Sequence, residues 1–171
     1  MSTRLQLSLF VPEPVATILE SVRRVLDPVQ ASLIPAHVTL CREDELVGVD
    51  EDALRSRIAA APLRQLVLDF GAPEPFSGHG ILLPCVAGEP EFQQVRRWIL
   101  ASASVRRLAP HITLAHPRNP KAVGNDLQNA AALAGGTSAT FEIVHRIEQV
   151  GSAPWRITGT YRLGVNAARA V

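Results

Sequence analysis

Two segments of this chain, 74 residues apart, carry the same pattern of a histidine, a β-branched apolar residue, a threonine and a leucine. The first is HVTL at 37–40 and the second is HITL at 111–114. With five histidines and eight threonines in 171 residues, chance would give about 0.2 occurrences of His-x-Thr in the whole chain. The doubled pattern therefore indicates an internal duplication, a shared function of the two segments, or both.

The residues that precede each pattern also repeat. VRRVL at 22–26 and VRRWI at 95–99 are 73 residues apart, so a helix with an arginine pair comes before each His-x-Thr segment in nearly the same register. Each half is too short to bury a good core alone, whereas 171 residues suit one domain. We therefore expect a single domain over 1–171, made of two pseudo-symmetric lobes with a cleft between them.

Hydrophobic periodicity predicts the order strand, helix, strand, helix, strand twice, followed by one further strand. The expected strands cover 5–11, 37–40, 65–70, 80–86, 111–114, 139–150 and 155–165. The expected helices cover 15–26, 50–61, 91–102 and 120–136, and 71–80 is expected to be a turn-rich link. The arginine pairs at 23–24, 96–97 and 106–107 are interpreted as solvated charges of helices and loops.

The composition is that of a soluble globular protein, because 47% of the residues are apolar and 19% are charged. A formal net charge of +1 predicts no general attraction to polyanions. The two cysteines lack the spacing of a metal-binding pair and are expected to be reduced thiols. No apolar stretch has the length of a signal peptide or a membrane span, so we expect a cytoplasmic protein without membrane contact.

Strand geometry gives the repeated pattern a chemical meaning. Side chains alternate along a strand, so His37 and Thr39 share one face while Val38 and Leu40 share the other, and 111–114 follows the same rule. The two hydroxyls could bind the oxygens of a phosphate, and one neutral and one protonated imidazole could serve as base and acid. The chain lacks the carboxylate-histidine clusters typical of a catalytic metal site, so we expect neither a metal nor a cofactor.

Two such motifs in a duplicated α/β chain of this length resemble the 2H phosphoesterase superfamily, which includes bacterial 2′,5′ RNA ligases and cyclic nucleotide phosphodiesterases. The resemblance implies an α+β fold, two-lobed and internally duplicated, with antiparallel sheets lining a central cleft and helices packed outside. It implies an enzyme that acts, without metal or ATP, on 2′,3′-cyclic phosphates or 2′,5′-phosphodiester bonds of RNA ends or small nucleotides. It assigns catalysis to His37, Thr39, His111 and Thr113 without settling which histidine is the base. We expect a monomer.

Three further residues are candidates for substrate binding. SAPWRITGTY at 152–161 resembles an aromatic element of the superfamily, so Trp155 could stack on a base. Arg107 directly precedes the segment of the second motif, and His79 lies in a turn before the first strand of the second half. Where many members of the superfamily have an arginine after the second motif, this chain has His116.

Two other residues are interpreted as bystanders. Cys41 has the strand parity of His37 and Thr39 and is expected to face the cleft, while His145 shares a strand face with apolar residues and is expected in the core or at a lobe edge. Three alternative functions remain open on the sequence: a 2′,5′ RNA ligase running the reverse reaction, a non-catalytic RNA- or nucleotide-binding module, and a metal-dependent hydrolase. The exact substrate is not determined by the sequence.

Overall fold

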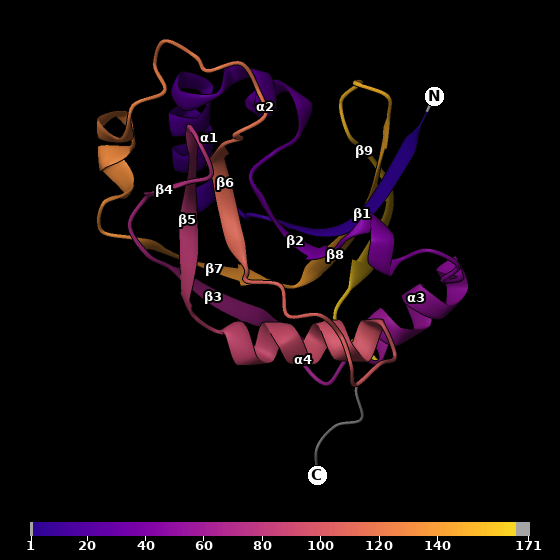
Figure 1. Cartoon of the computed structure of the whole chain (residues 1–171). Helices are drawn as coiled ribbons and strands as arrows, with labels where there is room; N and C mark the ends of the chain where they lie inside the picture. Colours follow the sequence, from indigo (N-terminus) through magenta and orange to yellow (C-terminus); the bar gives the residue numbers. More distant parts are fainter. Residues whose placement is uncertain (1, 167–171) are drawn as a thin grey trace.

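The computed structural model describes residues 2–166 and contains two antiparallel sheets with helices packed around them (Figure 1). The first sheet has the strand order β2-β1-β8-β9, with β1 (Thr3–Phe10), β2 (His37–Cys41), β8 (Ile143–Val150) and β9 (Arg156–Arg162). The second has the order β4-β5-β3-β7, with β3 (Leu66–Phe70), β4 (Glu74–Phe76), β5 (Gly80–Ala87) and β7 (Thr137–Phe141); β6 (His111–Ala115) also pairs with β5. The predicted α+β fold with antiparallel sheets is confirmed.

The helices of the described part are α1 (Val15–Leu26), α2 (Pro28–Leu33), α3 (Glu51–Ala59), α4 (Glu89–Ile99) and the short 3₁₀ helices Glu43–Glu45 and Leu127–Leu133. α1 has the bounds that its apolar periodicity predicts, and it buries Leu19, Val22 and Leu26. α2 was not predicted; the carboxylate of Asp27 caps it by accepting the Gln30 N–H, and proline opens it. Within residues 2–166, no helix has the length and apolar character required to cross a membrane.

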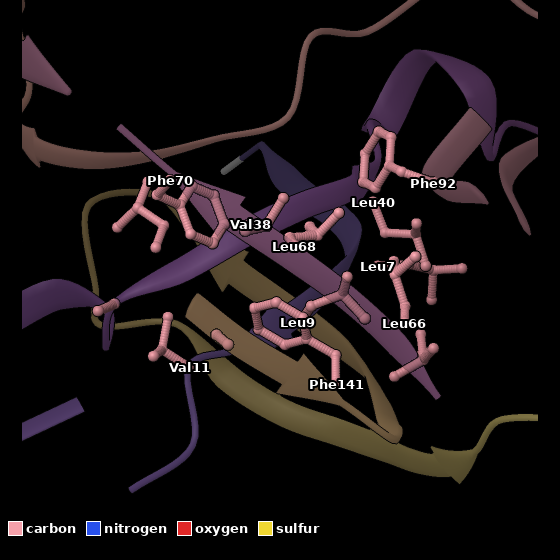
Figure 2. Packing of buried hydrophobic residues seen from close by; sticks show 14 of the residues in the cluster. Leu7, Leu9, Val11, Val38, Leu40, Leu66, Leu68, Phe70, Phe92 and Phe141 are labelled. Atoms are coloured by element: carbon pink, nitrogen blue, oxygen red, sulfur yellow. The ribbon is translucent and has the colours of Figure 1, made fainter. Parts of the chain in front are cut away.

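The hydrophobic core is one continuous cluster shared by both sheets (Figure 2). Leu7 and Leu9 of β1 meet Leu68 of β3 and Phe141 of β7, and all four side chains are at most 2% exposed. Because these strands belong to different sheets, the two halves of the chain stabilise each other through the same buried apolar area.

Two expected elements differ in the structure. The helix expected over 120–136 is wrong: 120–126 is not helical, and only Leu127–Leu133 forms a 3₁₀ helix. Gly124 explains part of this difference, because a Cβ there would lie 2.5 Å from the Val25 carbonyl oxygen, so this loop lies directly against the backbone of α1. The single strand expected over 139–150 is two strands, because the chain passes from the second sheet to the first at Glu142.

The interpretation of the arginine pairs as solvated charges is wrong for one member of each helical pair. Arg24 and Arg97 are exposed, but Arg23 and Arg96 are 0% exposed. Each lies on the buried side of its helix beside a core valine, and its guanidinium binds carboxylate and carbonyl oxygens inside the molecule. These bonds offset the cost of burying each charge, although Arg23 Nε has no hydrogen-bond partner among the described residues.

Candidate active site

The two motif strands occupy matching places in the two sheets. β2 pairs with β1, the strand that precedes α1, and β6 pairs with β5, the strand that precedes α4. On both strands the apolar residues are 0% exposed, while the histidine and threonine are half-buried. The alternation expected from the sequence therefore places His37 and Thr39 on one face of β2, and His111 and Thr113 on one face of β6, away from the core.

Both motif strands carry a β-bulge directly after the threonine. In β2, Thr39 pairs with Ser8 and Cys41 pairs with Leu7, so Leu40 is the extra residue. In β6, residue 114 is the extra residue in the same way. A bulge changes the parity of every following residue, which turns Cys41 onto the core face beside Leu7. The expectation that Cys41 faces the cleft is thus wrong: it is 0% exposed, and burial raises the pKa of its thiol to about 12.

The imidazoles of the two motif histidines are held by the same kind of hydrogen bond. His37 Nδ1 lies 2.8 Å from the Pro35 carbonyl oxygen, and His111 Nδ1 lies 2.9 Å from the Ala109 carbonyl oxygen. A carbonyl only accepts, so each Nδ1 carries the proton and donates it. In the neutral form, Nε2 of each ring is consequently unprotonated, and it is the nitrogen that remains free to accept or return a proton.

Each histidine also lies against a phenylalanine. The Phe10 ring meets His37 edge-on at 6.3 Å between centroids, and the Phe76 ring lies 6.2 Å from His111. Phe10 is opposite His37 in the β1–β2 pair, whereas Phe76 comes from β4, which was expected to be part of a turn. Burial lowers the pKa of His37 to about 4.

One cleft brings the two motifs together. It has a volume of about 550 Å³, and its lining includes all four motif residues, His37, Thr39, His111 and Thr113. Cationic side chains line the same cleft, namely Arg4, Arg42 and Arg118, against one carboxylate, Glu43, among the described lining residues. The cleft therefore combines proton carriers, hydroxyl donors and positive charge, which is the chemistry needed to bind a phosphate group.

Of the three predicted substrate-binding residues, one lines the cleft and two lie outside its lining. Trp155 lines the cleft, with the Arg4 guanidinium 5.2 Å from its ring centroid and its main-chain N–H donating to the Leu33 carbonyl. Arg107 is exposed outside the lining, where it forms a bidentate pair with Glu89 at 2.7 and 2.9 Å. His79 is also outside the lining, and its Nε2 lies 2.9 Å from the Asn119 carbonyl oxygen.

His116 and Arg118 line the cleft beyond the second motif, and the sequence did not assign them a binding role. His116 Nδ1 accepts the Arg118 N–H at 3.2 Å, so the proton of the neutral ring is on Nε2. Burial lowers the pKa of His116, mainly through loss of solvation. The signal available in the sequence was their place in HPR, directly after the strand that carries the motif.

His145 is half-buried at the edge of the site. Its ring stacks on Phe10 at 4.7 Å between centroids, and burial lowers its pKa. Phe10 in turn meets His37, so His145 supports the site from behind rather than lining it. Among residues 2–166, no group of three or more histidine, cysteine, aspartate and glutamate side chains is arranged to hold a metal ion.

No family model and no curated protein sequence matches the chain. Its fold matches Escherichia coli LigT, in a complex with NADP⁺, with a TM-score of 0.59, 16% identity and coverage of 94% of this chain and 98% of LigT. The chain has the fold of LigT. A second structure, TT0787 of Thermus thermophilus, matches with a TM-score of 0.53, 21% identity and coverage of 94% and 97%. A structure described as a phosphoesterase matches with a TM-score of 0.51, 14% identity and coverage of 95% and 99%.

The match to LigT covers nearly the whole length of both chains. The fold that the resemblance of the two motifs implied is therefore confirmed.

Proposed function

We propose that this protein is a phosphoesterase that uses His37 and His111 as an acid–base pair on 2′,3′-cyclic phosphates or 2′,5′-phosphodiester bonds of RNA ends or small nucleotides. One observation carries the proposal: both histidines donate Nδ1–H to a carbonyl two residues earlier, and both line the cleft that the two threonines also line. Two imidazoles held in one tautomer beside two hydroxyls suit proton transfer to and from a phosphate ester.

We propose opposite roles for the two rings. Burial lowers the pKa of His37 and favours its neutral form, which suits the base, and the acid role then falls to His111. His37 Nε2 takes a proton from a water molecule as the water oxygen forms a bond to phosphorus. The bond from phosphorus to the leaving ribose oxygen breaks, and protonated His111 gives its Nε2 proton to that oxygen. The two rings have then exchanged protonation states, which solvent restores before the next turnover.

The other lining residues supply binding. Thr39 and Thr113 could each donate a hydrogen bond to a non-bridging oxygen, and Arg118 adds positive charge without an ion pair among the described residues. Trp155 offers a flat surface for a base. The LigT structures that hold 3′-AMP, ATP and NADP⁺ support a nucleotide as the bound class, because the present chain has the same fold.

The test is hydrolysis of 2′,3′-cyclic nucleotides and 2′,5′-linked dinucleotides in excess EDTA. We expect turnover that persists in EDTA and falls by about a thousandfold or more in His37→Ala and in His111→Ala, since each change removes one proton carrier. Arg107→Ala is the control, because Arg107 lies outside the cleft in a pair with Glu89, and its turnover is expected to equal that of the wild type.

Other outcomes decide among the alternatives. Loss of turnover in EDTA would favour a metal-dependent hydrolase, and tight nucleotide binding without turnover on the whole panel would favour a binding module. Joining of a 2′,3′-cyclic end to a 5′-hydroxyl end by the same two histidines would identify a ligase, because the 5′-hydroxyl would then attack phosphorus in place of water. We also propose a cytoplasmic location, which the two free thiols support.

A further inference from the structure

Two of the most buried charged side chains take no part in the proposed reaction. Arg96 on α4 is 0% exposed, and Asp27, between α1 and α2, is 2% exposed. Burying a charge is costly unless every polar atom finds a partner, so the partners of a buried charge reveal what it holds in place.

Arg96 is bonded to the first motif and to the segment that leads to the second. Its Nε donates to the Leu40 carbonyl at 2.9 Å, and its Nη1 donates to the Arg106 carbonyl at 3.0 Å. Leu40 is the bulged residue that directly follows Thr39, and Arg106 lies in the segment that leads to the second motif. The third guanidinium nitrogen, Nη2, pairs with the Glu45 carboxylate, which neutralises the buried charge. One guanidinium therefore joins the end of the first motif to the approach of the second.

Asp27, in the first half of the chain, is bonded to the end of the second motif strand. Its Oδ2 accepts the His116 N–H at 2.9 Å and the Asn119 side-chain N–H at 2.9 Å, while Oδ1 accepts the Gln30 N–H that begins α2. His116 is the residue directly after β6. A carboxylate at the end of the first-half helix thus holds the end of the second motif strand.

The two connections cross between the halves. α1 packs against β6, and α4 packs against β2, so each helix covers the motif strand of the other half (Figure 1). Arg96 of α4 then binds the Leu40 carbonyl in β2, and Asp27, directly after α1, binds the His116 N–H directly after β6. Because main-chain atoms are held, the positions of the strands are set relative to each other rather than the rotamer of one side chain.

We propose that Arg96 and Asp27 are positioning residues, whose crossed bonds to the ends of β2 and β6 hold His37 and His111 at the separation needed to act on one phosphate. This rests on the proposed function, in which the two imidazoles work as a pair. Displacement of reacting groups by about 1 Å can cost on the order of a hundredfold in rate. Loosening either connection should accordingly lower kcat far more than it changes KM.

Asp27→Asn is the sharpest variant. Asparagine caps a helix as well as aspartate does, so Oδ1 can still accept the Gln30 N–H, but the new NH₂ group would face the His116 N–H donor to donor. We expect a folded protein whose kcat falls by about 10- to 100-fold and whose KM stays within about threefold of the wild type. The double variant Arg96→Met with Glu45→Leu removes the other connection, and it replaces the ion pair with apolar groups that can preserve folding.

Arg57→Met is the matched control. Arg57 also donates to a main-chain carbonyl, that of Ile99 at 3.1 Å, but it joins α3 to α4 without bonding to either motif strand. Its kcat should stay at the wild-type value. Wild-type kcat in folded Asp27→Asn, or an equal fall of kcat in Arg57→Met, would overturn the proposal.

A second measurement does not depend on turnover. Nitrogen-15 NMR of the imidazoles should show shifted or doubled signals for both His37 and His111 in Asp27→Asn and unchanged signals in Arg57→Met. If the wild type turns over none of the cyclic or 2′,5′-linked substrates, the proposed function fails, whereas the NMR comparison still decides whether these residues position the pair. Unchanged imidazole signals in folded Asp27→Asn would refute the positioning role.

Discussion

At the scale of single residues, the two histidines share a tautomer and a place on their strands, but their protonation is set by their surroundings. His37 is flanked by Phe10 and by the second histidine, and burial is the main reason that its pKa falls to about 4. The Pro35 carbonyl partly opposes this, because it accepts the Nδ1 proton. A histidine that stays neutral in the folded state has a consequence for stability as well as for catalysis.

Acidification should therefore destabilise the protein through His37. Its pKa is about 4 when folded and about 6.5 when unfolded, so the unfolded chain binds an extra proton between these values. The free energy of unfolding is thus unaffected above pH 6.5 and falls as the pH drops towards 4. We expect His37→Gln to abolish part of this loss, of the order of 3 kcal/mol. Urea unfolding at pH 7.5 and pH 4 measures it, and equal losses in the two proteins would contradict the assigned pKa.

At the scale of elements, the bulges of β2 and β6 decide which residues belong to the site. In each strand, only the histidine and the threonine lie on the cleft face. The extra leucine that follows changes the alternation, so the next residue, Cys41 or Ala115, lies on the core face. The sequence predicted the alternation of 37–40 and 111–114 because a two-residue period is local. It did not reveal the bulges, since they depend on the registers with β1 and β5.

Thiol reactivity tests the bulge in β2. Cys41 is on the core face with its pKa raised by burial, whereas Cys85 is half-buried, with its thiol donating to the Ala87 carbonyl. We expect an aromatic disulfide reagent to label one thiol per native chain and two after unfolding. Cys85→Ala should show no labelling while folded. Labelling of the folded Cys85→Ala protein at the rate of an exposed thiol would show that Cys41 faces the cleft.

At the scale of the whole molecule, the cleft is assembled from segments that are far apart in the chain. Four of its lining residues come from the two ends and the middle of the sequence, namely Arg4, Arg42, Arg118 and Trp155. Contacts between β2 and β6 bring the two motif strands to this cleft. Trp155 is tied to the C-terminal end of α2 by the bond from its main-chain N–H to the Leu33 carbonyl. It belongs to the wall of the cleft rather than to the reacting centre.

Trp155→Ala should accordingly separate binding from chemistry. Loss of a stacked base costs about 1–3 kcal/mol, which predicts a rise in KM of about 5- to 150-fold for a nucleotide substrate with kcat changed by less than about threefold. Trp155→Phe should recover most of the affinity, because it retains an aromatic face. Steady-state kinetics provide the measurement, and a fall in kcat at constant KM would place the indole in the reaction instead.

The sequence by itself determined the elements whose information is local. The periodicity of 15–26, the alternation in both motifs and the 73- to 74-residue repeat indicated the helix, the two strand faces and the paired halves. Tertiary structure alone decided that Arg23 and Arg96 are buried, that Arg107 and His79 lie outside the cleft and that Asp27 bonds to the end of β6. The physical reason is that burial and hydrogen-bond partners depend on which segments meet in the fold. The residues around Arg96 and Asp27 in the sequence give no sign of the Leu40 carbonyl or the His116 N–H that they contact in the other half.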